Sequence, residues 1–100
     1  MLTFEKIQQT VAAYFRDKPV KKVWLFGSYA RGEATEESDV DLLLRYNDTP
    51  KRVSLLDILK MSEELKALLA KNVQLTEEGR VYKPFEAGIF QDRRPVYENG

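Results

Sequence analysis

Histidine and cysteine are both absent from this chain of 100 residues. Without cysteine there is no disulfide and no thiolate nucleophile, and without histidine there is no Ser-His-Asp triad and no ordinary zinc site. Carboxylates remain, because the chain contains 16 Asp and Glu residues. Catalysis by this chain would therefore depend on carboxylates together with a hard cation such as Mg²⁺ or Mn²⁺.

Long apolar runs and an excess of either charge are also missing. No stretch approaches the ~18 apolar residues of a membrane-spanning helix, and residues 1–5 lack the basic start and apolar core of a signal peptide. Lys and Arg balance Asp and Glu at 16 against 16, so any site for a polyanion must be local. These absences predict a reduced cytoplasmic protein, and the length predicts one domain over residues 1–100.

The stretch from Gly27 to Asp41 organises the rest of the chain. It follows residues 21–26, a run rich in β-branched and aromatic side chains that predicts a buried strand. Gly27 ends this strand, and Ser28 is expected to cap a short helix over residues 29–31. Because the start of a helix presents free N–H groups, the turn suits a phosphate. Gly27 would allow close approach of the backbone, and Ser28 would offer a hydroxyl.

Two carboxylates open the next apolar run. Side chains alternate along a strand, so Asp39 and Asp41 would share one face, with their Cα atoms ~6.6 Å apart. At that spacing both can bind one hard cation or two adjacent ones, and without a cation they would repel each other. An alternative interpretation is that Ser38 and Asp39 are ordinary turn residues and that Asp41 is merely exposed. The spacing from the Gly-Ser pair, between two apolar runs, favours a site for metal and phosphate.

The same residues match a family signature. Gly27, Ser28, ten intervening residues, Asp39 and Asp41 resemble the signature of minimal nucleotidyltransferases in the DNA polymerase β superfamily. The resemblance implies an α/β (α+β) nucleotidyltransferase fold, in which Gly27 and Ser28 hold a nucleoside triphosphate. It also implies that Asp39 and Asp41 are catalytic and bind Mg²⁺ for transfer of a nucleotidyl group.

Arg31 lies just after the Gly-Ser turn and is a candidate nucleotide-binding residue. A guanidinium at this position can contact a triphosphate bidentately. The alternative is an exposed salt bridge with Glu33 or Glu36, which would contribute little to stability.

The family pattern breaks at one position. Many nucleotidyltransferases of this superfamily carry a third carboxylate on a later strand, in a context like Val-Asp-Leu, and the matching residue here is Gln74. An amide can coordinate a cation through its carbonyl oxygen, but it adds no negative charge and cannot act as a base. Glu77 or Glu78, in the loop that follows, is an alternative source of the missing carboxylate. The sequence therefore leaves catalytic activity open.

The remaining segments predict a small mixed β-sheet flanked by helices. Helical periodicity runs over residues 3–17, with Thr3 as the N-cap, and again over residues 54–70, where Ser54 and Asp57 form a capping box. A turn is expected at residues 47–50, a third strand at residues 73–76, a short helix after Pro84 and an extended segment at residues 95–97. The second long helix would bury one apolar face made of Leu55, Ile58, Leu59, Leu65, Leu68 and Leu69.

Four aromatic residues near the C-terminus are interleaved with basic ones. They are Tyr82, Phe85, Phe90 and Tyr97. Large apolar side chains are usually buried, so about two of the four are expected in the core. The others are expected on a surface that binds a partner.

The resemblance also implies an activity and a partner. Single-domain members of this kind are often encoded beside a helical HEPN-family protein, as the antitoxin of a toxin–antitoxin pair, and some transfer AMP to a tyrosine of the toxin. This chain is accordingly expected to be such an antitoxin, with ATP as its substrate. An alternative is a catalytically degenerate nucleotide-binding module that neutralises its partner by contact alone. Modification of a small molecule such as an aminoglycoside is disfavoured, because the enzymes of that kind that resemble this domain add a second domain around the acceptor.

Overall fold

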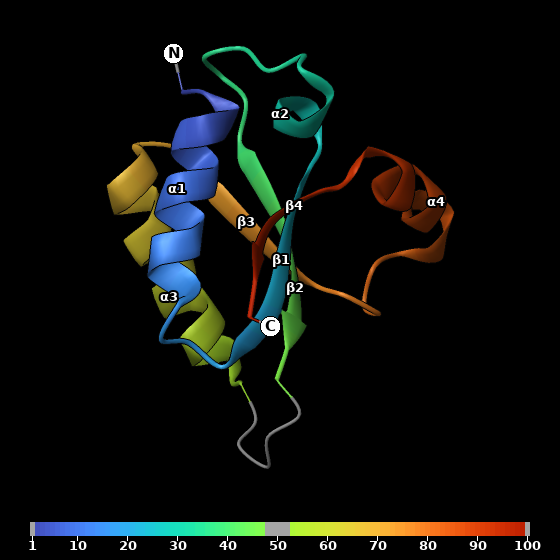
Figure 1. Ribbon diagram of the computed structural model, residues 1–100. Helices are drawn as coiled ribbons and strands as arrows, with labels where there is room; N and C mark the ends of the chain where they lie inside the picture. The colour runs from blue at the N-terminus through green and yellow to red at the C-terminus, as the bar shows by residue number, and fades with distance from the viewer. Residues whose placement is uncertain (1, 48–52, 100) are drawn as a thin grey trace.

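A four-stranded mixed sheet forms the centre of the molecule, in a computed structural model that describes residues 2–47 and 53–99. The elements in chain order are α1 (Phe4–Phe15), β1 (Val20–Phe26), α2 (Ser28–Arg31), β2 (Val40–Tyr46), α3 (Leu55–Leu69), β3 (Val73–Glu77), α4 (Lys83–Asp92) and β4 (Arg94–Glu98). The strand order is β3-β2-β1-β4. β1 is antiparallel to β2 and β4, whereas β2 and β3 are parallel and are connected through α3. The predicted small mixed sheet flanked by helices is confirmed (Figure 1).

The main core lies between the sheet and the pair of helices α1 and α3, which cover one face (Figure 1). Alternate residues of the two central strands point into it, as the period of a strand requires. The strands contribute Val23, Leu25, Val40, Leu42 and Leu44, and the helices contribute Ile7, Val11, Phe15, Leu65 and Leu69. Each large apolar side chain buried in this way stabilises the fold by roughly 1.5–3 kcal/mol.

Side-chain hydrogen bonds cap the N-termini of both long helices, α1 and α3, as the sequence predicts. The Thr3 hydroxyl accepts a hydrogen bond from the Lys6 amide at 3.1 Å. Ser54 and Asp57 form a reciprocal capping box at the start of α3. The two helices are joined by the Tyr14 hydroxyl, which donates to Glu64 at 2.5 Å. The turn predicted at residues 47–50 lies outside the described residues, apart from Asn47.

Trp24 and Leu43 are buried on the opposite face of the sheet, and charged side chains lie over the Trp24 ring. The guanidinium carbons of Arg45 and Arg93 lie 5.0 and 4.5 Å from the centre of the Trp24 ring. Both guanidinium groups donate to the Glu78 carboxylate, at 2.8 and 3.2 Å. Figure 1 shows that α4 stands to one side of this face. Long side chains therefore cover the indole ring here, with their cations stacked on it.

Two expectations about burial are wrong. On α3, Leu55, Leu59 and Leu68 are more than half exposed, whereas Met61 is buried. The buried residues of α3 are Met61, Leu65 and Leu69, which recur every four residues and form the face that packs on the sheet. The three exposed leucines lie to the sides of that face.

The second error concerns the C-terminal aromatic residues. Tyr97 packs against the core, but Tyr82, Phe85 and Phe90 are 69%, 64% and 44% exposed. These three residues lie on or next to α4, which is displaced from the sheet (Figure 1).

Within residues 2–47 and 53–99, no helix is both long and apolar enough to cross a membrane.

Candidate active site

The Gly-Ser turn lies where β1 ends and the short helix α2 begins. Gly27 has φ 76° and ψ −154°, a conformation that is essentially confined to glycine. Its carbonyl oxygen accepts hydrogen bonds from the amides of Ala30 and Arg31, both at 3.1 Å. A Cβ atom added at Gly27 would lie 2.4 Å from Oδ2 of Asp41. Glycine is therefore required both by the backbone and by the close approach of a carboxylate.

Ser28 does not cap the helix as the sequence predicts. Gly27 occupies the N-cap position, Ser28 is the first helical residue, and the cap has no side-chain hydrogen bond. Glycine takes this position because only it adopts the backbone angles of the turn. Within the described part of the chain the Ser28 hydroxyl has no hydrogen-bond partner. Its oxygen is thus available to a ligand.

The two predicted carboxylates come together beside this turn. Asp39 directly precedes β2, and Asp41 is the second residue of the strand, opposite Phe26 in the register with β1. Both side chains are half-buried. Burial raises the pKa of Asp41, the negative charge of Asp39 raises it further, and the positive charge of Arg31 opposes both effects. The pair therefore carries the electrostatic strain that a bound cation would relieve.

Arg31 is held by carboxylates on both sides. Its Nε atom donates to Glu33 and its Nη1 atom donates to Asp92 of α4, each at 3.2 Å. The predicted salt bridge with Glu33 is present, and the one with Asp92 spans 61 positions of sequence, so no local signal could have indicated it. These bonds use two of the five N–H donors of the guanidinium. The others can still contact a phosphate.

Gln74 lies next to Asp41, at the position where the family resemblance leads us to expect a third carboxylate. The parallel register of β2 and β3 places Gln74 beside Asp41, and residues paired in this way share a face of the sheet. Glu77 and Glu78 do not supply the missing carboxylate. Both lie toward the far end of β3, where Glu77 binds Arg80 and Glu78 binds Arg45 and Arg93.

The donor set suits a hard divalent cation with few protein ligands. Asp39 and Asp41 offer carboxylate oxygens, and Gln74 offers an amide oxygen on the same side of the sheet. Among the described residues, no group of three or more acidic, histidine or cysteine side chains could hold a metal. Mg²⁺ is commonly bound through one or two carboxylates together with substrate phosphates, so Asp39 and Asp41 are sufficient for that mode of binding.

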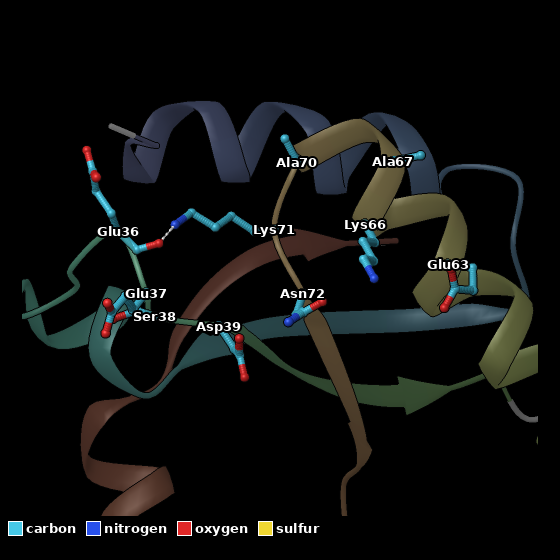
Figure 2. A pocket seen from close by; sticks show the side chains of 10 residues that line it. All are labelled: Glu36, Glu37, Ser38, Asp39, Glu63, Lys66, Ala67, Ala70, Lys71 and Asn72. Carbon is cyan, nitrogen blue, oxygen red and sulfur yellow. Dashed lines mark hydrogen bonds between the residues drawn. The ribbon is translucent and has the colours of Figure 1, made fainter.

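Contacts from the end of α3 fix the loop that carries Asp39. Lys71 donates a hydrogen bond from Nζ to the backbone carbonyl of Glu36 (Figure 2). The Val40 amide donates to the Asn72 carbonyl at 2.9 Å. Neither Lys71 nor Asn72 was expected at the site, because both follow α3 in the sequence and reach the loop only through the parallel pairing of β2 and β3.

Comparison with known proteins identifies relatives of the whole fold. Residues 5–97 match the family model described as the nucleotidyltransferase domain. The protein adenylyltransferase MntA of Thermococcus cleftensis is 40% identical over 79 residues, which cover 75% of this chain and 77% of that protein.

Solved structures show the same arrangement of elements. One match is a chain of a toxin–antitoxin crystal structure with AMP-PNP, with a TM-score of 0.77, 16% identity and coverage of 92% of this chain and 73% of that one. Another is a chain of the Shewanella oneidensis complex of a tri-AMPylated HEPN toxin with its MNT antitoxin, with a TM-score of 0.71, 13% identity and coverage of 95% and 72%. At these identities the likeness establishes the fold alone.

Proposed function

The chain belongs to the nucleotidyltransferase domain family, and we propose that it is an antitoxin that transfers AMP from ATP to a tyrosine hydroxyl of a HEPN-family partner. Mg²⁺ or Mn²⁺ would be bound by Asp39 and Asp41. The observation that carries the proposal is the contact between the Gly-Ser turn and the acidic pair, because a Cβ atom at Gly27 would collide with the Asp41 carboxylate. A phosphate-binding turn and a cation-binding pair therefore form one site.

The names of the related proteins support this choice of nucleotide and acceptor. The Thermococcus cleftensis relative is named a protein adenylyltransferase. One structural neighbour contains AMP-PNP, an ATP analogue, and another contains an AMPylated HEPN toxin bound to its antitoxin. From these names we infer that this chain uses ATP, attaches AMP to its acceptor and binds a HEPN-family partner.

The residues of the turn would hold the phosphates that leave. The Ala30 and Arg31 amides donate to the Gly27 carbonyl, so the donors that the start of α2 presents beside Gly27 are the amides of Ser28 and Tyr29. The Ser28 hydroxyl adds another donor, and the free N–H groups of Arg31 add positive charge. A cation on Asp39 and Asp41 would neutralise charge on the α-phosphate and make its phosphorus more electrophilic. Together these groups would orient ATP so that its α-phosphate faces the acceptor.

A nucleotide-binding module without transferase activity is the alternative function, and Gln74 is the observation that favours it. The residue pairs with Asp41, where the family resemblance leads us to expect a third carboxylate, yet it can neither add charge nor accept a proton as a base. Such a module would neutralise its partner by contact alone. The two functions differ in their product, because only the enzyme leaves AMP attached to the partner.

The test is incubation of the protein with each labelled nucleoside triphosphate, Mg²⁺ or Mn²⁺, and a HEPN-family partner. We expect label from ATP on a partner tyrosine, identified by mass spectrometry, and none with Asp41→Asn. A tight complex that acquires no label with any nucleotide would reject the enzyme and support the binding module.

A further inference from the structure

A polar hollow opens beside the acidic pair, between the loop before β2, the end of α3 and the start of β3 (Figure 2). Its volume is about 710 Å³, within the range of sites that hold small ligands or side chains. Asp39 lines this hollow, but Gly27, Ser28 and Arg31 do not. A smaller hollow of about 410 Å³ contains Gly27 and Arg31 instead. The open space beside Asp39, toward α3, is therefore separate from the open space between the Gly-Ser turn and α4, which neither carboxylate of the pair lines.

The geometry of phosphoryl transfer assigns different roles to these spaces. In an in-line displacement, the attacking oxygen and the leaving oxygen lie on opposite sides of the phosphorus. With the leaving phosphates at Gly27 and Ser28, as in the function proposed above, the acceptor must approach from the side of Asp39. We propose that the hollow beside Asp39 is the acceptor subsite and that Lys66 contacts the acceptor oxygen. This inference rests on the proposed function.

Lys66 has the position and the freedom that this role requires. It lies in the last turn of α3, and Figure 2 shows its side chain pointing away from the helix on the side where Asn72 lies. Within the described residues Lys66 forms no ion pair, whereas Lys71 is engaged by the backbone carbonyl of Glu36. The neighbouring side chain on the same wall is Ala67, which leaves space for an incoming ring.

A lysine at this point removes the need for a histidine or carboxylate base. A tyrosine phenol has an ordinary pKa of about 10, and a nearby ammonium group favours its ionised form. The proton passes to water, since the hollow is open to solvent. The phenolate oxygen then forms a bond to the α-phosphorus, and the bond from that phosphorus to the oxygen of the β-phosphate breaks. Pyrophosphate leaves with the electron pair, and AMP remains on the tyrosine.

The charges around the hollow also indicate the kind of segment that carries the acceptor. Glu36, Glu37 and Glu63 line it, and none of these carboxylates forms an ion pair within the described part of the chain. A partner segment with Lys or Arg beside its tyrosine would complement them. The subsite is thus suited to a tyrosine in a basic surface segment.

The first experiment replaces Lys66 and measures kinetics with the HEPN-family partner and Mg·ATP. Lys66→Met should lower kcat/KM for the partner by about 100- to 1,000-fold, the range for loss of one charge-stabilising group. The affinity for Mg·ATP should stay unchanged, and Lys66→Arg should retain most of the activity. Lys60→Met is the matched control, because Lys60 lies on the same helix but lines a different hollow. The kinetics of Lys60→Met should match those of the wild-type protein.

The second experiment fills the hollow without changing its charge. Ala67→Phe, at an exposed helical position, should block modification of the partner and leave the thermal shift by Mg·ATP intact. A loss of Mg·ATP binding in this variant would show that the nucleotide itself binds in the hollow, and it would overturn the inference. If the wild-type protein is active and both Lys66→Met and Ala67→Phe keep its kinetics, this inference fails while the proposed function stands. If the wild-type protein transfers no AMP, the proposed function and this inference both fail.

Discussion

At the scale of single residues, Gly27 connects the two halves of the site. Gly27→Ala should destabilise the fold by roughly 2–4 kcal/mol, because the new Cβ meets Asp41 Oδ2 at 2.4 Å and the backbone conformation suits only glycine. Gly32→Ala is the control, since Gly32 also has a positive φ of 73°, but a Cβ atom added there would meet no atom of the described residues within 4 Å. It should cost only about 1–2 kcal/mol. Denaturant unfolding measures both values.

A double-mutant cycle separates the collision from the backbone strain. In an Asp41→Ala background the carboxylate is gone, so Gly27→Ala should cost about 1 kcal/mol less than it does alone. Equal costs in the two backgrounds would show that the Asp41 carboxylate does not limit the turn.

The raised pKa of Asp41 defines the direction in which its replacement should change stability with pH. The pKa of Asp41 is raised in the folded protein, so its ionisation opposes folding, and stability is lost as the pH rises through that pKa. Asp41→Asn should therefore raise Tm at neutral pH without metal, and the gain should disappear in acid. The same variant, like Asp39→Asn, should lose most of the thermal shift produced by Mg·ATP. A full shift in both variants would exclude the acidic pair as the metal site.

Gln74 provides a gain-of-function test. Because Gln74 pairs with Asp41 in the parallel register, Gln74→Asp should place a third carboxylate at the site. We expect a lower Tm without metal, and stronger binding of divalent cations with higher transferase activity when metal is present. Thr76→Asp is the control, since Thr76 shares this face but pairs with Leu43, further from the acidic pair. If both variants respond to metal equally, Gln74 does not face the site.

At the scale of elements, sequence patterns located every helix and strand of the described chain but not how far each is covered. Alternation and helical periodicity depend on neighbours along the chain. For that reason the sequence predicts the Thr3 N-cap, the capping box of Ser54 and Asp57, and the strand at residues 73–76. Burial depends on which face of a helix packs on the sheet. Leu55 and Leu59 have helical spacing, but they lie to one side of the face that Met61, Leu65 and Leu69 form, so they stay exposed.

The exposed aromatic residues of helix α4 lead to a prediction about binding of the partner. Its exposed aromatic residues are available to bind a partner, so Phe85→Asp should weaken the complex with the HEPN-family protein by about 10-fold or more, with little change in Tm. Ala87→Asp adds the same charge at an exposed position of the same helix without removing an aromatic ring, and it should have a smaller effect. Calorimetric titration gives both affinities. Equal affinities for all three proteins would remove α4 from the interface.

At the scale of the whole molecule, the carboxylates at the two ends of the sheet respond oppositely to pH. Hydrogen bonds from Arg45, followed by its charge and that of Arg93, outweigh partial burial and lower the pKa of Glu78. Its contribution to stability is present above the ordinary carboxyl pKa of 4.5 and is lost as the pH falls through the lowered value. Glu78→Gln should therefore lower Tm at neutral pH and have a smaller effect in strong acid. The opposite trend would show that Glu78 is not paired in solution.

The sequence contained the core of the candidate site but not its surroundings. Gly27, Ser28, Asp39 and Asp41 lie within one strand–turn–strand segment, so their spacing alone predicts that they meet. Asp92 and Lys66 reach the site through the packing of α4 and the parallel pairing of β2 with β3, which local patterns do not encode.

The most direct test of the account is a comparison of ATP labelled at the α-phosphate with ATP labelled at the γ-phosphate. Each is incubated with the protein, Mg²⁺ and a HEPN-family partner. We predict that the partner acquires the α-label, with one pyrophosphate released for each AMP attached and with none of either product in Asp41→Asn. Label from the γ-phosphate on the partner, or a stable complex with no label from either nucleotide, would contradict the assignment of this site to AMP transfer.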